Sequence, residues 1–168
     1  MGTQTDLNTK TEQKHTSEFD LISDLTNFRQ KMTELDTLTI SFDHSVCTYQ
    51  GYERIEITKQ SDSISIVSNF KELTFEENPK WERIYDMKIS ENDTIWKFEQ
   101  FLERNEKRKN ADQNKRGILM LTDKKDTIRY STDGLVDLNQ FLADYYETMK
   151  KIYPENKNGI YGVEIVDE

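Results

Sequence analysis

The feature of the sequence that most constrains the fold is a block of alternating apolar and polar residues between positions 37 and 89. Successive side chains of a β-strand point to opposite faces of a sheet, so this period of two predicts strands with one buried face. The apolar positions that define the four predicted strands are Leu38, Ile40 and Phe42, then Ile55 and Ile57, then Ile64 and Ile66, and last Tyr85, Met87 and Ile89. Turns near 50–51 and 60–62 and the break at 76–79 separate them, so the block predicts an antiparallel meander.

Three segments with apolar residues at helical spacing surround this block. The first covers roughly 18–35 and starts after Ser17, and the second starts near Ser90. The third is the strongest: it runs from Leu135 to Ile152 and stops before Pro154, because proline cannot continue a helix.

Two further short runs, 117–121 and 127–130, flank a polar turn and predict a β-hairpin. The tail at 159–166 is compatible with an edge strand or with loose packing. The expected fold class is therefore α+β, a mostly antiparallel sheet (meander plus hairpin) packed with about three helices, in the order α-β-β-β-β-α-β-β-α(-β).

The N-terminal residues are too polar to bury themselves. Residues 1–16 are predicted to be a disordered polar arm, and residues 17–168 a single α+β domain. One interpretation is a lipoprotein whose signal peptide and lipidated cysteine are replaced by Met1-Gly2, which favours the periplasm or cell envelope slightly over the cytoplasm. The alternative is an ordinary disordered terminus. No run of residues has the length of a transmembrane helix.

The net charge of −9 bears on the partners that the protein can attract. Both halves of the chain are acidic, which disfavours duplex nucleic acid and would favour a basic protein partner. The simpler interpretation is that the charge keeps the protein in solution. The single cysteine, Cys47, lies in a strand-like stretch and is interpreted as a buried small hydrophobe.

The residues that usually indicate chemistry are not arranged in any recognisable motif. No nucleotide-binding glycine motif and no nucleophile elbow is present, and one cysteine with two histidines cannot supply a zinc site. Asp133 and Asp137 are interpreted as residues at the start of the last helix, and Asp123 and Asp126 as turn residues. We therefore predict no catalytic residue, no metal site and no cofactor.

A partner surface is predicted at the end of the last helix, where aromatic residues have acidic neighbours. Its residues are Asp144, Tyr146, Glu147 and Tyr153. The alternative for Tyr146 is packing beneath the adjoining loop. Trp81 and Trp96 are interpreted as core or core-edge residues.

A small acidic domain with strong helices, a meander and no recognisable site resembles bacterial immunity proteins in type, although no motif supports the resemblance. It implies a non-enzymatic protein-binding domain that neutralises a toxin by forming a stoichiometric complex. The alternatives are a small-ligand-binding envelope lipoprotein or an enzyme of unrecognised type. A deep apolar pocket would favour a ligand, whereas a solid core with an aromatic, acidic face would favour a partner.

Overall fold

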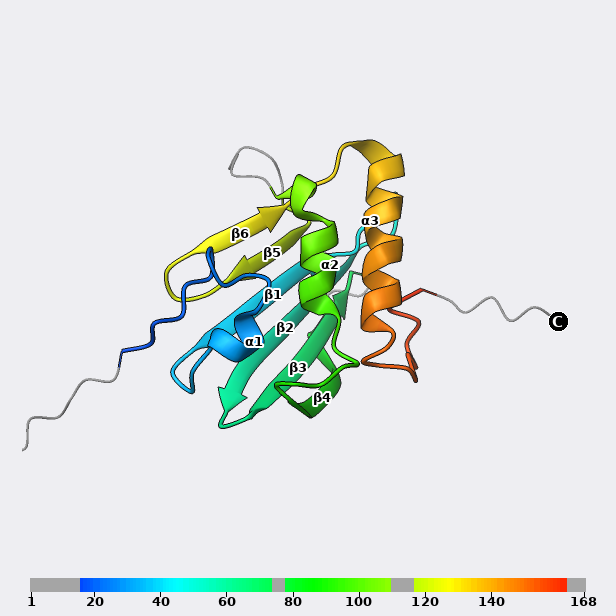
Figure 1. Ribbon diagram of the computed structural model, residues 1–168. Coiled ribbons are helices and arrows are strands. Elements are labelled where there is room, and N and C mark those ends of the chain that lie inside the picture. Colours follow the sequence, from blue (N-terminus) through cyan, green and yellow to red (C-terminus); the bar gives the residue numbers. More distant parts are fainter. Residues whose placement is uncertain (1–15, 74–77, 110–116, 163–168) are drawn as a thin grey trace, which may run out of the picture.

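The centre of the protein is a six-stranded antiparallel sheet with strand order β4-β3-β2-β1-β5-β6. The computed structural model describes residues 16–73, 78–109 and 117–162 (Figure 1). The strands are β1 (Thr37–Asp43), β2 (Gly51–Gln60), β3 (Ser63–Glu72), β4 (Glu82–Ser90), β5 (Leu119–Thr122) and β6 (Thr127–Tyr130). The expected meander and hairpin are confirmed, and β1 joins them because it pairs with both β2 and β5. The arm predicted at residues 1–16 lies outside the described residues except for Thr16.

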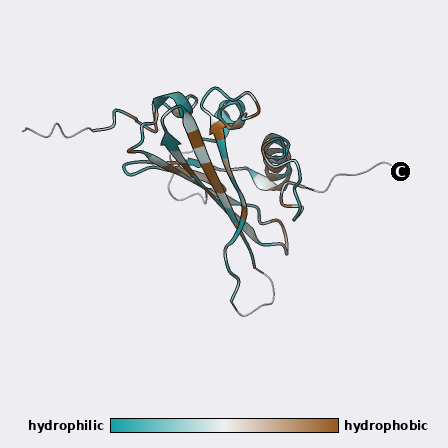
Figure 2. Ribbon diagram, turned by 90° about the horizontal axis from the view of Figure 1, so that it is seen from below, coloured by the Kyte–Doolittle hydropathy of each residue, from teal (hydrophilic) through white to brown (hydrophobic). Residues whose placement is uncertain are grey.

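All the helices lie on one face of the sheet, as Figures 1 and 2 show from two directions. They are α1 (Phe28–Lys31), α2 (Phe98–Arg104) and α3 (Gly134–Met149), with a short 3₁₀ turn, η1 (Glu106–Arg108), after α2. The protein therefore has two layers, a sheet with one covered face and one open face. The expected order of helices and strands is confirmed.

The core fills the space between the two layers, because every second strand residue points towards the helices. In β1 these residues are Leu38, Ile40 and Phe42, and all three are buried. The ring of Phe42 lies 4.0 Å from that of Tyr145 in α3, measured between centroids. Burying a side chain of this size contributes about 1.5–3 kcal/mol, so such contacts hold α3 against the sheet.

The helix expected over roughly 18–35 is a single turn, α1, preceded by a series of turns. The apolar spacing was informative, because Leu21 and Leu25 are buried. Local side chains replace the helical hydrogen bonds, however: Asp20 accepts from the backbone N–H of Ser23 at 2.8 Å, and the backbone N–H of Asp20 donates to Asp24 at 3.1 Å. Aspartates that bond to nearby backbone groups favour turns over helices.

The second helix begins later than predicted. Ser90 is the last residue of β4, and α2 starts at Phe98. Asp93 accepts hydrogen bonds from the backbone N–H groups of Ile95 at 2.7 Å and Trp96 at 3.2 Å, so it stabilises a turn before the helix.

Two smaller expectations concern Cys47 and the C-terminal tail. The first was wrong, and the second falls only partly within the described residues. Cys47 is exposed and has a φ of 52° in the turn between β1 and β2, so it is not a buried strand residue. The tail at 159–166 was expected to form an edge strand or to pack loosely, and its described part, 159–162, forms turns with Ile160 and Tyr161 buried. Residues 163–166 lie outside the described part of the chain.

Candidate functional site

The structure brings the residues of the predicted partner surface to the same region, but it uses most of their side chains internally. Asp144 in α3 accepts hydrogen bonds from Arg104 at 2.7 Å and from the side-chain amide of Asn105, also at 2.7 Å. These contacts link α3 to α2 and the residue that follows it. Glu147 is exposed, so it remains available to a partner.

The two tyrosines of that prediction pack against the body of the protein. The ring of Tyr146 is stacked on that of His44, with centroids 5.8 Å apart and an interplanar angle of 7°. Tyr153 packs on Tyr85, with centroids 5.4 Å apart, and on Tyr161. Both are partly buried, so the aromatic part of the predicted surface contributes to the fold.

Beneath these rings lies a carboxylate that is almost completely excluded from solvent. Glu53 in β2 is 1% exposed. Hydrogen bonds reach it from Ser68 at 2.7 Å, from Tyr145 at 2.9 Å and from the hydroxyl of Tyr161, and His44 Nε2 lies 3.0 Å away. A carboxylate can accept several hydrogen bonds, and both oxygens of Glu53 have partners here. Its burial therefore leaves neither oxygen without a hydrogen bond.

The tyrosines in and around this Glu53 cluster have raised pKa values. Burial, followed by the nearby charge of Glu53, raises the pKa of Tyr145 and Tyr161 well above the usual range. Burial also raises the pKa of Tyr146 to about 12. The Nδ1 atom of His44 is buried and has no hydrogen-bond partner among the described residues.

Chemically, the Glu53 cluster contains a carboxylate beside an imidazole, a combination that general acid–base catalysis uses. Catalysis also needs a substrate within hydrogen-bonding distance. Here Glu53, His44 and Tyr161 are each 2% exposed or less. This geometry fits a polar network that fixes β2, α3 and the C-terminal turns relative to one another.

Sequence reasoning missed this cluster, although a signal for it was present. Glu53 is in phase with the buried Ile55 and Ile57, and His44 is in phase with the buried positions of β1. In an alternating strand, an acidic residue at a position that faces the core indicates a buried carboxylate, which needs hydrogen-bond partners. Tyr145 and Tyr161 were not predictable as those partners, because they are 92 and 108 residues away.

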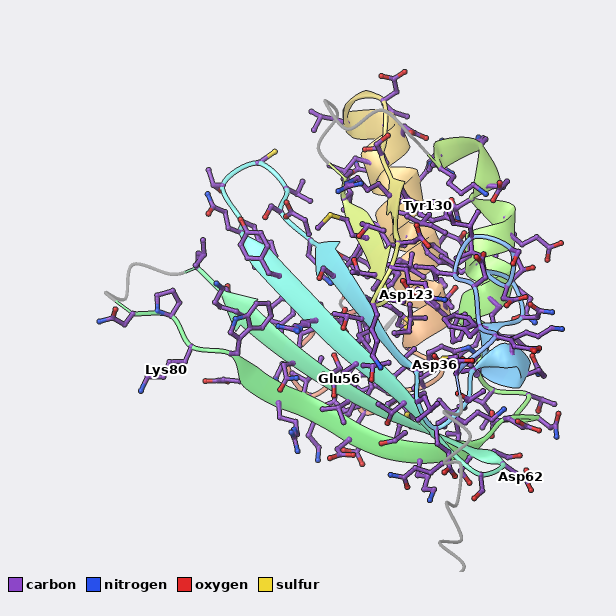
Figure 3. All side chains as sticks on the ribbon, turned by 90° about the vertical axis from the view of Figure 1, so that its left-hand side faces the viewer. Asp36, Glu56, Asp62, Lys80, Asp123 and Tyr130 are labelled. Atoms are coloured by element: carbon purple, nitrogen blue, oxygen red, sulfur yellow. The ribbon has the colours of Figure 1, made fainter. Side chains whose placement is uncertain are left out.

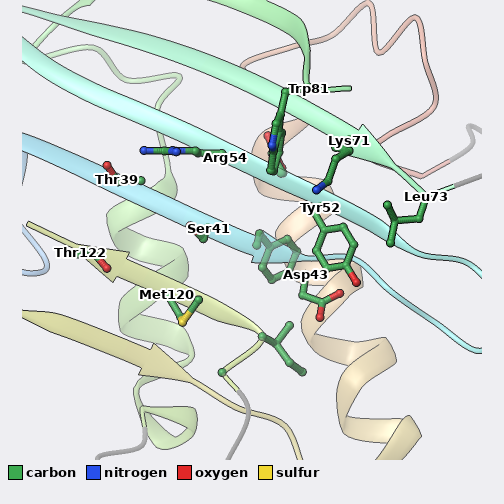
Figure 4. Close-up of a pocket in the computed structure, with 14 residues that line it drawn as sticks. Thr39, Ser41, Asp43, Tyr52, Arg54, Lys71, Leu73, Trp81, Met120 and Thr122 are labelled. Carbon is green, nitrogen blue, oxygen red and sulfur yellow. The ribbon is translucent and has the colours of Figure 1, made fainter. Parts of the chain in front are cut away.

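The opposite, open face of the sheet presents the residues that alternate with the core. Figure 3 shows side chains crowded between the sheet and the helices, with Glu56 on the open face. A groove of about 770 Å³ lies across β1, β2, β3 and β5 on this face. Its lining includes Ser41 of β1, Tyr52 and Arg54 of β2, Lys71 of β3 and Met120 of β5. Figure 4 shows these side chains projecting from neighbouring strands.

Two aromatic rings and a lysine form one end of this groove. The ammonium of Lys71 lies 5.0 Å from the ring centroid of Trp81 and 5.7 Å from that of Tyr52 (Figure 4). Trp81 is 47% exposed, so its assignment to the core or core edge was wrong. It precedes β4 and packs over Lys71 on the open face, whereas Trp96 is 1% exposed and in the core, as predicted.

Within residues 16–73, 78–109 and 117–162, no group of three or more His, Cys, Asp or Glu side chains is arranged to hold a metal ion. Among the helices of those ranges, none has both the length and the hydropathy of a transmembrane span. Of the concave surfaces described, we assign the open groove of about 770 Å³ to a ligand or partner.

Comparison with known proteins finds no family model that matches the chain, no curated protein with a matching sequence and no solved structure that matches it. The function must therefore be argued from the residues themselves.

Proposed function

We propose that this protein is a non-enzymatic binding domain that holds a protein partner on the open face of its sheet. The observation that carries the proposal is the open groove, whose rim combines Trp81, Tyr52 and Arg54. Tryptophan, tyrosine and arginine are the residue types most enriched where protein interfaces concentrate their binding energy. Because these residues lie on an exposed surface and the core is filled, the composition suits binding of a protein partner better than enclosure of a substrate.

The class of activity that we propose is neutralisation of a toxin by a stoichiometric complex, as in bacterial immunity proteins. The support is the combination of a small two-layer fold with an open groove on one face of its sheet. In addition, the carboxylate–imidazole pair that most resembles catalytic machinery, Glu53 and His44, is sealed from solvent. A rigid, pre-formed sheet also lowers the entropy lost on binding.

The test is binding to the toxin-like proteins encoded beside this chain. Each candidate is co-expressed with the full chain, and the complex is measured by size-exclusion chromatography and calorimetry. We expect a one-to-one complex that Trp81→Ala weakens by about 30-fold, the effect of losing an aromatic contact worth about 2 kcal/mol. Rescue of growth in cells that express the toxin is the functional readout.

The matched control is Glu147→Ala, which alters the exposed residue of the surface predicted from sequence, on the helix side. If the open face is the interface, Glu147→Ala leaves the affinity within about twofold. A complex that responds to Glu147→Ala and ignores Trp81→Ala would move the interface to α3. A well-folded chain that binds none of the candidates would count against neutralisation itself.

A second candidate function is binding of a small ligand, because the groove volume of about 770 Å³ falls in the range of ligand sites. Ligand sites of that size usually surround most of their ligand, whereas this groove spans an open sheet face. A ligand that raises the melting temperature of the wild-type chain but not of Trp81→Ala would favour this alternative.

A further inference from the structure

The charges on the open face have the opposite balance to the charges of the whole chain. The chain carries −9. On the strands of the open face, the cations outnumber the carboxylates. The cations are Arg54, Lys71, Arg83, Lys88 and Arg129, and the carboxylates are Asp43, Glu56 and Asp86. Net charge is therefore a misleading guide to the partner of this face.

The three arginines among these cations lie in one cross-strand row of the sheet. The cross-strand register runs from Arg83 in β4 through Asn69 to Arg54 in β2, and then through Ser41 and Met120 to Arg129 in β6. We call these six residues the arginine row. Because residues in register project from the same face, the row places cations at both edges of the sheet and near its middle.

The cations of the arginine row are largely uncommitted. Arg83 makes an exposed ion pair with Asp86 at 3.1 Å. Among the described residues, the side chains of Arg54 and Arg129 make no hydrogen bond and no ion pair, although their backbones belong to the sheet. An arginine presents a planar set of donors that matches a carboxylate in two parallel hydrogen bonds. The row therefore offers two arginines that can each bind a carboxylate, Arg54 next to the aromatic end of the groove and Arg129 on the edge strand β6.

We propose that the open face recognises an acidic, extended segment of a protein partner, laid across the strands along the arginine row. This inference rests on the proposed function and specifies the partner's chemistry. Adjacent strands are about 4.8 Å apart, so the row is about 24 Å long and an extended segment of about seven residues spans it. Carboxylates on the segment pair with Arg54 and Arg129, and an apolar or aromatic residue packs on Trp81 and Tyr52.

A polypeptide fits this face better than a single-stranded nucleic acid. Asp43, Glu56 and Asp86 are interspersed with the cations, and a backbone with a phosphate at every step would meet them. A peptide can place carboxylates opposite the arginines and neutral or basic residues opposite the acids.

The experiment measures binding of fluorescein-labelled oligoglutamate, oligolysine and oligouridylate of matched length to the full chain by fluorescence anisotropy at low salt. We expect oligoglutamate to bind and the double variant Arg54→Glu/Arg129→Glu to weaken it by at least about tenfold. The control is Lys31→Glu/Lys151→Glu, which makes the same change in net charge at exposed residues on the helix side. We expect the control to stay within about twofold, since distant exposed charges are screened by salt.

The possible results separate this inference from the proposed function. Preference for oligolysine, or equal loss in both double variants, overturns the acidic segment and leaves the open face as a possible partner surface. Tighter binding of oligouridylate, lost in Arg54→Glu/Arg129→Glu, replaces the peptide with a nucleic acid. If no probe binds while both variants keep the wild-type melting temperature, the inference is wrong, and complex formation with Trp81→Ala still decides the proposed function.

Discussion

Glu53 and Arg54 are neighbours in β2, but their side chains project to opposite faces of the sheet. One charged group is therefore buried and the other is exposed. Glu53 points to the covered face, where it is 1% exposed and surrounded by hydroxyl groups and an imidazole. Arg54 points to the open face, where it is exposed and has no ion-pair partner among the described residues. The partners of Glu53 are supplied by the fold itself, whereas Arg54 can pair with a group from another molecule. We therefore place the proposed binding surface on the open face.

The first and largest test of this comparison removes the buried charge. Glu53→Ala leaves Tyr145, Tyr161 and Ser68 buried without their acceptor, and it creates a cavity. We expect the free energy of unfolding to fall by about 3–5 kcal/mol, the usual effect of breaking a buried charged network. Urea denaturation monitored by circular dichroism measures it. A loss below about 1 kcal/mol would mean that the cluster does not hold the layers together.

A smaller effect is expected when one partner of the cluster is removed. Tyr161→Phe deletes the hydroxyl that donates to Glu53, and a hydrogen bond to a charged group contributes about 1.5–3 kcal/mol. The matched control is Tyr52→Phe on the open face, which we expect to change the stability by less than about 0.5 kcal/mol. Denaturation curves of the two variants, collected side by side, give the difference. Equal losses would contradict the contrast between the two faces.

The covered face should also respond to alkaline pH. Burial raises the pKa of Tyr146 to about 12, and those of Tyr145 and Tyr161 rise further, from an ordinary value of 10.0. Above pH 10 the unfolded chain loses these protons first, so their contribution is complete below pH 10 and is lost as the pH rises through the folded-state values. Urea denaturation at pH values from about 9 to about 11 should show falling stability. A flat profile would contradict burial of these hydroxyls.

The smallest expected effect is on the open face. Arg54→Ala removes an exposed side chain without a partner among the described residues, so the stability should change by no more than about 0.5 kcal/mol. Thermal and urea denaturation measure it. If Arg54→Ala also reduces partner affinity, Arg54 contributes to binding and the adjacent Glu53 contributes to stability. A loss of more than about 1 kcal/mol would show that Arg54 supports the fold.

Regular alternation made the sheet predictable from sequence. Leu38, Ile40 and Phe42 are separated by polar residues, and only a strand places them on one face. The first helix was overestimated because a spacing of three or four residues is also satisfied by successive turns, which Asp20 and Asp24 stabilise here. Propensity and spacing cannot detect such local hydrogen bonds in advance.

The candidate site was harder to predict than the fold. The sequence prediction chose Tyr146 and Tyr153 because aromatic residues had acidic neighbours, and the structure packs both rings against the body of the protein. Trp81 was assigned to the core or core edge because tryptophan is usually buried, and the sequence alone cannot tell which face of a strand end stays uncovered. The arginine row depends on the register of all six strands, and register is set by tertiary pairing.

The contacts of Glu53 also have a consequence for the order in which the chain folds. Its partners His44 and Ser68 are 9 and 15 residues away, within the meander, whereas Tyr145 and Tyr161 are 92 and 108 residues away. Local strand pairs form quickly, and contacts that close long loops form late. We therefore expect the carboxylate of Glu53 to lose its last water only when Tyr145 and Tyr161 pack against it. A chain that ends before Tyr161 lacks one donor to Glu53, so we expect water to take the place of that hydroxyl.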